Sequence, residues 1–249
     1  MTSLLPILLP LLLQVTVSPG DSLSAARDAA RGKRSTVVLR GGTYFLTEPL
    51  VFKAEDSDTT YRAAPGETVV ISGGRALGGW KKTEAGLWTL QVPDGLRFNQ
   101  LFIDGKRRPR ARTPNEGSFF RVDGAITEEK PARLKYKEGD LRADWAARGD
   151  VEIVALQKWA ELRMPLTAVD AATRTATLSG PVQKWIIEKS ARYWVENAPD
   201  LIDAPGEWYL DKKSGLLTYK PLDGEDPAKV VAIAPALSQL LRNEGASRL

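Results

Sequence analysis

Short apolar runs separated by glycine and proline occupy residues 36–74. The runs lie at 36–39, 50–52, 60–61 and 69–71 and consist mainly of β-branched and aromatic residues. Gly-Gly, Glu-Pro and Pro-Gly pairs stand between them. A helix would not survive such frequent interruption, so the pattern predicts four short strands joined by tight turns.

These runs also repeat loosely along the chain. Pairing Val38 with Tyr61 gives an offset of 23 residues, and pairing Val51 with Val70 gives 19. Offsets of this size are typical of solenoid coils, although the repeat is not strict. The preceding Ala-rich segment 22–31 begins at a good N-cap, Ser22, and is followed by Gly32, so it predicts a short helix. Such a helix would cap the open end of a solenoid.

Antiparallel strands are expected after residue 97. Residues 100–103 (QLFI) run into Asp104-Gly105, the dipeptide that favours a two-residue hairpin turn. Three further strands, at 150–156, 162–169 and 173–178, are joined by short polar links and predict a β-meander.

Two other segments complete the pattern. Residues 207–211 and 216–220 predict a hairpin with Gly215 at the position that needs a left-handed backbone. The stretch 128–148 is rich in Lys, Glu and Ala but lacks periodicity, so we expect a mobile surface excursion there.

The leading apolar run, residues 4–17, predicts a secretory signal that occupies residues 1–20. Small and polar residues follow it at 18–21, as at a cleavage site, although the first basic side chain is Arg27. A membrane span needs about 20 apolar residues, and this run of 14 contains Pro6 and Pro10. The alternative is a buried or membrane-anchoring helix. We expect a secreted protein (extracellular, periplasmic or cell-surface) without a membrane span after cleavage.

Composition then removes whole classes of chemistry. The 249 residues include no His and no Cys, which excludes a Ser-His-Asp triad, a Cys-His nucleophile and zinc sites built on imidazole or thiolate. No nucleotide-binding loop is present either, since the glycine pairs lack a following Lys-Ser or Lys-Thr. We expect neither a cofactor nor a metal.

The remaining carboxylates offer two candidate groups. Glu207 and Asp211 would share one face of a strand but lie roughly 13 Å apart, which is too far for either mechanism of glycoside hydrolysis. A turn-supporting role is therefore expected for both. Glu55, Asp56 and Asp58 form a dense acidic cluster, for which a calcium site is the alternative to an ordinary loop.

A basic cluster is the strongest candidate for binding. Between Arg97 and Arg112 six basic residues accompany one acidic residue, a local charge of +5. The candidate substrate-binding residues are Arg107, Arg108, Arg110, Arg112 and the strand-linking Trp159. Arginine forks bind carboxylates, sulfates and sugar hydroxyls, while the alternative is that they tie segments together through carbonyls and carboxylates. Nucleic acid is not expected for a secreted chain.

Four motifs point to a family. They are GGTYFLTEPLVF (41–52), APGETVVISGG (64–74), QLFIDGKRRPRARTPNEG (100–117) and DAPGEWYLDKKSGLLTYKPLDG (203–224). In this order they resemble secreted bacterial right-handed parallel β-helix proteins with a pectin lyase-like fold. They are most similar to the N-terminal part of glycoside hydrolases of families 141 and 120.

The resemblance implies a mostly β chain: the start of a right-handed parallel β-helix with an N-terminal cap helix and an inserted antiparallel β-sandwich-like domain. The cap helix and first coils would occupy 21–96, the inserted domain 97–200, and a hairpin and next coil 201–249. Such proteins continue through further coils, so we expect a truncated chain, with unknown catalytic residues that lie outside it. The open C-terminal edge would then allow self-association.

Two functions remain open at this point. The first is the N-terminal fragment of a glycoside hydrolase that acts on a plant-type or other complex polysaccharide. The second is a noncatalytic glycan-binding or cell-surface module. The expected partner in both is a polysaccharide or oligosaccharide, and fold alone does not choose between them.

Overall fold

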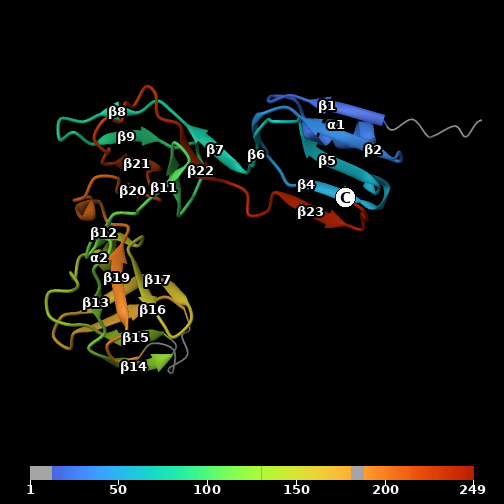
Figure 1. Ribbon diagram of the computed structural model, residues 1–249. Helices are drawn as coiled ribbons and strands as arrows, with labels where there is room; N and C mark the ends of the chain where they lie inside the picture. The colour runs from blue at the N-terminus through green and yellow to red at the C-terminus, as the bar shows by residue number, and fades with distance from the viewer. Residues whose placement is uncertain (1–12, 130, 181–187) are drawn as a thin grey trace, which may run out of the picture. The chain divides into compact units, whose positions relative to one another are not determined.

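The computed structural model describes residues 13–129, 131–180 and 188–249, and its regular structure is mostly β (Figure 1). The chain forms two compact units. Unit 1 combines Met1–Arg75 with Pro235–Leu249, and unit 2 is the continuous segment Ala76–Ala234. The chain therefore leaves unit 1, builds unit 2, and returns to finish unit 1.

Unit 1 is built from parallel strand pairs. One sheet has the order β1 (Leu13–Val17), β2 (Ser35–Leu39), β5 (Thr59–Ala63). The other two sheets pair β3 (Gly42–Phe45) with β6 (Val69–Ser72), and β4 (Leu50–Lys53) with β23 (Leu241–Glu244). All these strand pairings are parallel, as expected for successive coils, although Lys53 and Gly245 also form an isolated antiparallel bridge. Within the described residues no sheet closes on itself.

The register differs from the sequence-based pairings. Tyr61 lies opposite Val37, so the predicted partner Val38 is wrong by one residue. Val51 lies opposite Arg242 rather than Val70, because β23 returns from the far end of the chain to cover β4. A local search for repeats cannot find a partner that lies beyond a 159-residue excursion.

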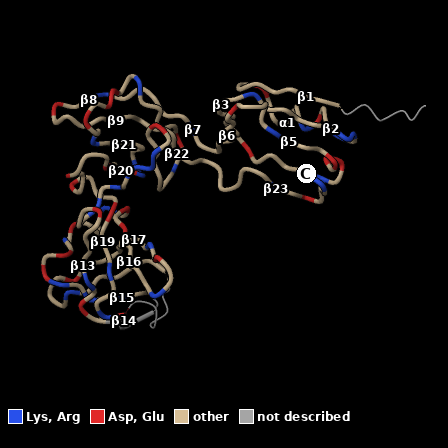
Figure 2. The backbone as a smooth tube through the Cα atoms, in the orientation of Figure 1, with Lys and Arg blue, Asp and Glu red and all other residues tan. Residues whose placement is uncertain are grey.

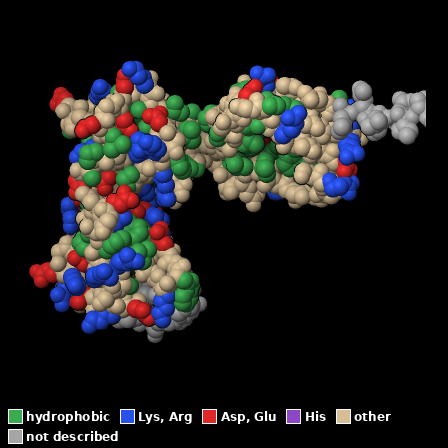
Figure 3. Space-filling view, in the orientation of Figure 1, with side chains coloured by type: hydrophobic (Ala, Val, Ile, Leu, Met, Phe, Trp, Pro, Cys, Tyr) green, Lys and Arg blue, Asp and Glu red, His purple; other side chains and the backbone are tan. Residues whose placement is uncertain are grey.

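The predicted helix is present as α1 (Leu23–Ala30), and the Ser22 hydroxyl accepts the Ala25 N–H at 3.1 Å. Its buried side chains, Leu23, Ala26 and Ala30, pack into the core of unit 1. A single 3₁₀ turn, η1 (Ala54–Asp56), follows β4. Apolar side chains also gather on the face of unit 1 seen in Figure 3.

Strand β1 overlaps the end of the predicted signal segment, residues 1–20. Val17 is buried, and its carbonyl accepts the Arg40 N–H at 2.8 Å and the Tyr44 hydroxyl at 2.9 Å. Residues 13–17 are thus part of the folded sheet, whereas the rest of the apolar run, residues 4–12, lies outside the described residues. Among the described residues, no helix has the length and apolar character to cross a membrane.

Unit 2 contains two four-stranded sheets that enclose one core. The first has the order β11 (Lys106–Arg108), β10 (Leu101–Ile103), β22 (Ala232–Pro235), β7 (Gly74–Leu77). The second has the order β20 (Trp208–Leu210), β21 (Leu216–Tyr219), β9 (Trp88–Gln91), β8 (Lys81–Lys82). Their shared core centres on Trp208, Tyr219 and Leu101.

Both predicted hairpins are confirmed. Asp104 and Gly105 have φ angles of 50° and 73° and join β10 to β11 as a two-residue turn. Gly215, with φ of 74°, ends the loop between β20 and β21. Each turn has the residue that tolerates a left-handed backbone at the position that requires it.

The largest sheet of unit 2 contains the predicted meander. Its order is β12 (Arg112–Thr113), β19 (Arg192–Glu196), β16 (Glu152–Leu156), β17 (Glu161–Asp170), β18 (Thr175–Leu178), β15 (Ala132–Lys135), β14 (Gly124–Glu129). Strand β13 (Phe120–Arg121) pairs with β19, and the short helices α2 (Trp145–Arg148) and η2 (Pro199–Leu201) lie between strands in the sequence. Consecutive strands β16, β17 and β18 are antiparallel, which confirms the meander.

The expected mobile excursion at 128–148 is wrong. Strand β15 lies within this segment and pairs with β18, and the side chains of Ala132 and Leu134 are completely buried. The alternation of buried and partly exposed residues over only four positions is too short to identify from the sequence.

Candidate binding pocket in unit 2

A pocket of about 420 Å³ opens in unit 2 where β11 leads into β12. Its wall is dominated by charged side chains. The lining residues are Asn99, Arg107, Arg108, Pro109, Arg110, Arg112, Glu116, Glu161, Arg163, Trp194 and Glu196. All four predicted arginines therefore lie at one site, and Figure 2 shows basic and acidic positions interspersed along this part of the chain.

Backbone hydrogen bonds fix the arginine-bearing segment between two strands. Trp208 on β20 donates its N–H to the Pro109 carbonyl at 3.2 Å, and Ala111 donates to the Trp208 carbonyl at 2.7 Å. On the other side, Arg112 lies opposite Glu196 in the pairing of β12 with β19. The segment is thus rigid backbone, and successive arginines point to different surroundings.

Arg110 is the most buried of the four. Its Nη1 lies 2.6 Å from Glu152 Oε2 and 2.6 Å from Glu196 Oε1, and the three side chains are 5–7% exposed. Glu152 and Glu196 are directly opposite each other on β16 and β19. Two carboxylates facing each other in the interior require a shared cation, and Arg110 supplies it.

Two further basic groups join this cluster. Lys212 Nζ lies 3.1 Å from Glu152 Oε1, and the Arg163 guanidinium contacts Glu196 and lies 3.0 Å from Glu161. Burial raises the pKa of Glu152, but the attraction of Arg110 and Lys212 outweighs it, so that the pKa lies below its usual value. Glu152 is therefore an ionised structural carboxylate and not a proton donor.

Arg108 lies on the buried side of the hairpin. Its Nη2 lies 2.6 Å from Glu225 Oε1, and its Nε donates to the Tyr219 hydroxyl at 3.1 Å. Both charged side chains are about one-tenth exposed, so the pair is shielded from water. Arg108 thus connects β11 to the segment that follows β21.

Arg112 binds carbonyls and an aromatic face. Its Nε donates to the Pro114 carbonyl at 2.9 Å, and its Nη2 donates to the Ser118 carbonyl at 3.1 Å. The guanidinium carbon lies 4.3 Å from the centre of the Trp194 ring. Burial lowers the pKa of Arg112 against the attraction of Glu116 and Glu207.

Arg107 and Trp159 face solvent. Arg107 is exposed opposite Phe102 on the hairpin, and within the described part of the chain its guanidinium forms no ion pair. Trp159 lies in the turn between β16 and β17 and is 71% exposed. Of the five candidate residues, these two have the most exposed side chains.

Sequence reasoning missed seven of the eleven lining residues, including Glu161, Arg163, Trp194 and Glu196. One signal was present: Glu152 and Glu196 each interrupt an apolar strand, at DVEIVAL and YWVEN. A single acidic residue in such a run indicates a buried charge with a basic partner elsewhere in the chain. The identity of that partner is set by tertiary contacts.

The other acidic candidates have structural roles. Glu207 is buried and accepts the backbone N–H groups of Arg112, Asp203 and Ala204 at 3.0–3.3 Å. Asp211 accepts two N–H groups of the following turn. The expected turn-supporting role is thus observed for both, although Glu207 is not solvated.

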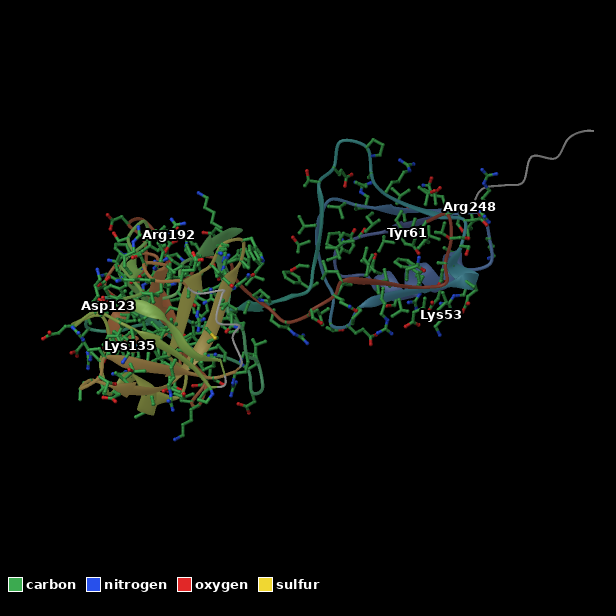
Figure 4. The ribbon with its side chains drawn as sticks, turned by 90° about the horizontal axis from the view of Figure 1, so that it is seen from below. Lys53, Tyr61, Asp123, Lys135, Arg192 and Arg248 are labelled. Atoms are coloured by element: carbon green, nitrogen blue, oxygen red, sulfur yellow. The ribbon has the colours of Figure 1, made fainter. Side chains whose placement is uncertain are left out.

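The acidic cluster of unit 1 is bound to arginines. Asp56 is buried, with Oδ1 2.7 Å from the Arg31 Nε, and Asp58 pairs with Arg248, which is labelled in Figure 4. Among the described residues no group of three or more acidic side chains is arranged to hold a metal. These carboxylates therefore stabilise the loop after β4.

The fold is similar to that of a solved carbohydrate-active protein. No family model and no curated protein match the sequence. A solved glycoside hydrolase matches 93% of the chain, with a TM-score of 0.75 and 26% sequence identity. The match covers 47% of that protein, so this chain spans about half its length. The complex of XylC with xylose matches 92% of this chain and 32% of that one at 15% identity, but its TM-score of 0.43 is too low to support an argument. The chain has a glycoside hydrolase-like fold.

Proposed function

We propose that the chain is part of a carbohydrate-active protein that acts outside the cytoplasm on a complex polysaccharide. The observation that supports this most directly is the similarity to a glycoside hydrolase over 93% of the chain. The parallel pairings of unit 1 support a second part of the proposal, namely that β1 to β6 and β23 belong to the first coils of a right-handed parallel β-helix.

The role of unit 2 in this proposal is to bind saccharide. Its pocket is of a size that suits small ligands and is lined by hydrogen-bonding side chains on a rigid backbone. The carboxylates that the pocket shares with Arg110 and Arg163 are committed to ion pairs, so we assign the pocket to binding and not to bond cleavage. Hydrolysis by the longer protein would then use residues outside this chain.

Binding to polysaccharide tests the proposal. The purified chain is incubated with insoluble xylan, pectin and cellulose, and the bound fraction is measured by sedimentation, with the heat-unfolded chain as control. We expect retention of the folded chain on at least one polysaccharide. Absence of binding to all of them, together with absence of binding to their soluble oligosaccharides, would refute the proposed function.

A further inference from the structure

The charges around the unit 2 pocket nearly cancel, although the arginines alone suggest a strongly basic site. Five basic side chains line the pocket, and five carboxylates line it or bond directly to its wall, so the two counts are equal. The basic residues are Arg107, Arg108, Arg110, Arg112 and Arg163; the acidic residues are Glu116, Glu152, Glu161, Glu196 and Glu225.

Most of these guanidiniums cannot be released to bind an anion. Arg110 is shared between two buried carboxylates at 2.6 Å each, and Arg108 is bound to Glu225 at 2.6 Å. A carboxylate or sulfate ligand that took either fork would leave a buried glutamate without its cation. Such an exchange gains one ion pair and loses another, so the guanidiniums of Arg108 and Arg110 give no net attraction for an anionic sugar.

The same wall suits hydroxyl groups. A sugar hydroxyl both donates and accepts, and a wall of alternating guanidinium and carboxylate groups provides acceptors beside donors. At the accessible rim Arg107 and Glu116 are exposed, and Glu161 is 46% exposed. These three side chains are able to form hydrogen bonds to a ligand without breaking a buried pair.

An exposed aromatic residue lies close to Glu161 along the chain. Trp159 is 71% exposed and precedes Glu161 by two residues, so their Cα atoms lie within about 7.6 Å, given about 3.8 Å per residue. Flat apolar rings combined with polar groups at one side are suited to bind the C–H face of a pyranose while its hydroxyls bond to neighbours. Because its Cα is this close to that of Glu161, Trp159 is a candidate to stack on a unit that projects from the pocket.

We infer that the unit 2 pocket binds an uncharged, hydroxyl-rich oligosaccharide, with Arg107, Glu116 and Glu161 bonding its hydroxyls and Trp159 stacking on an outer sugar ring. This inference rests on the proposed function and specifies its ligand class. It differs from the expectation for the basic cluster alone, which favours a uronate or a sulfated sugar. Neutral and anionic chains of equal length therefore distinguish the two.

The test is calorimetric titration of the full chain with xylohexaose and with a hexamer of galacturonate, at 0.1 M and 1 M NaCl. We expect xylohexaose to bind, with less than about twofold change between the two salt concentrations, because no ion pair with the ligand is screened. The galacturonate hexamer should bind at least about tenfold more weakly at both.

Matched variants locate the site. Trp159→Ala and Arg107→Gln should each weaken binding of xylohexaose by about fivefold or more, while each melts at the wild-type temperature because both side chains are exposed. The controls are Phe45→Ala, an aromatic ring of unit 1 that is 46% exposed, and Arg62→Gln on exposed β5; neither should change affinity.

Two results would overturn the inference alone: preferential binding of galacturonate that falls steeply with salt, or binding of xylohexaose that neither Trp159→Ala nor Arg107→Gln weakens. In both, saccharide still binds and the proposed function stands. Failure to bind either hexamer or any polysaccharide would refute both together.

Discussion

Arg110→Met is expected to destabilise unit 2 strongly, because it removes the cation shared by Glu152 and Glu196. All three side chains are 5–7% exposed, so solvent screens the interaction little. Breaking a buried pair of this kind costs about 3–5 kcal/mol, and the remaining Arg163 and Lys212 favour the lower end, about 3 kcal/mol. For a unit of 159 residues this corresponds to a fall in melting temperature of about 6–12 °C.

The effect should depend on pH in a defined direction. In the wild type, burial raises the pKa of Glu152, but Arg110 and Lys212 hold it below its usual value. The wild-type ion pair therefore stabilises the fold above the unfolded pKa of about 4.3 and is lost as the pH falls further. In Arg110→Met the pKa of Glu152 rises, so the variant regains stability on acidification. The deficit should be largest at pH 7 and shrink towards pH 4.

The assay is thermal unfolding followed by circular dichroism at pH 7 and pH 4.5. Lys229→Met serves as control, since its pair with Asp226 is 83% and 43% exposed and is therefore screened by solvent. Adding Glu152→Gln and Glu196→Gln to Arg110→Met should recover most of the loss, because no buried charge then remains unpaired. A loss below about 1 kcal/mol at pH 7, or one that persists unchanged at pH 4.5, would refute the reasoning.

Four other predictions follow from features described above. Glu207→Ala should destabilise the chain by about 1–3 kcal/mol in a thermal melt, since three partly buried N–H groups lose their acceptor. Asp211→Asn should leave any aryl-glycoside hydrolysis unchanged, and loss of turnover in this variant would show a catalytic role. If the chain is exported, N-terminal sequencing of the secreted protein should find processing before Leu13, because β1 belongs to the sheet, and a mature start at Asp21 would show that β1 is dispensable. Self-association through the edge strand β23, where Leu241 is 54% exposed, should appear in light scattering and be reduced in Leu241→Lys, so a monodisperse wild-type monomer would contradict it.

Sequence reasoning succeeded where the determining interactions are local. The Ser22 hydroxyl caps its helix by accepting the N–H of a residue three positions later, and Asp104-Gly105 turns a hairpin through its own backbone angles, so both are encoded in a few neighbouring positions. The register of unit 1 failed because Val51 meets Arg242, which is 191 residues distant. The pocket was only partly identified for the same reason. The arginines are close together in the sequence, but Glu152 and Glu196 join them only after the sheet of unit 2 has formed.

The return of β23 to β4 has a consequence for synthesis on the ribosome. β4 ends at Lys53, and its parallel partner begins at Leu241, so this sheet of unit 1 remains incomplete until residues 241–244 have left the exit tunnel. Unit 2 is complete in sequence earlier, and its first and last strands, β7 and β22, are neighbours in one sheet. Once unit 2 has folded, its first and last strands lie side by side. The loop that must close when β23 pairs with β4 is then effectively shorter. Order of emergence thus favours folding of unit 2 first, with Pro235–Leu249 completing unit 1 once this segment has emerged.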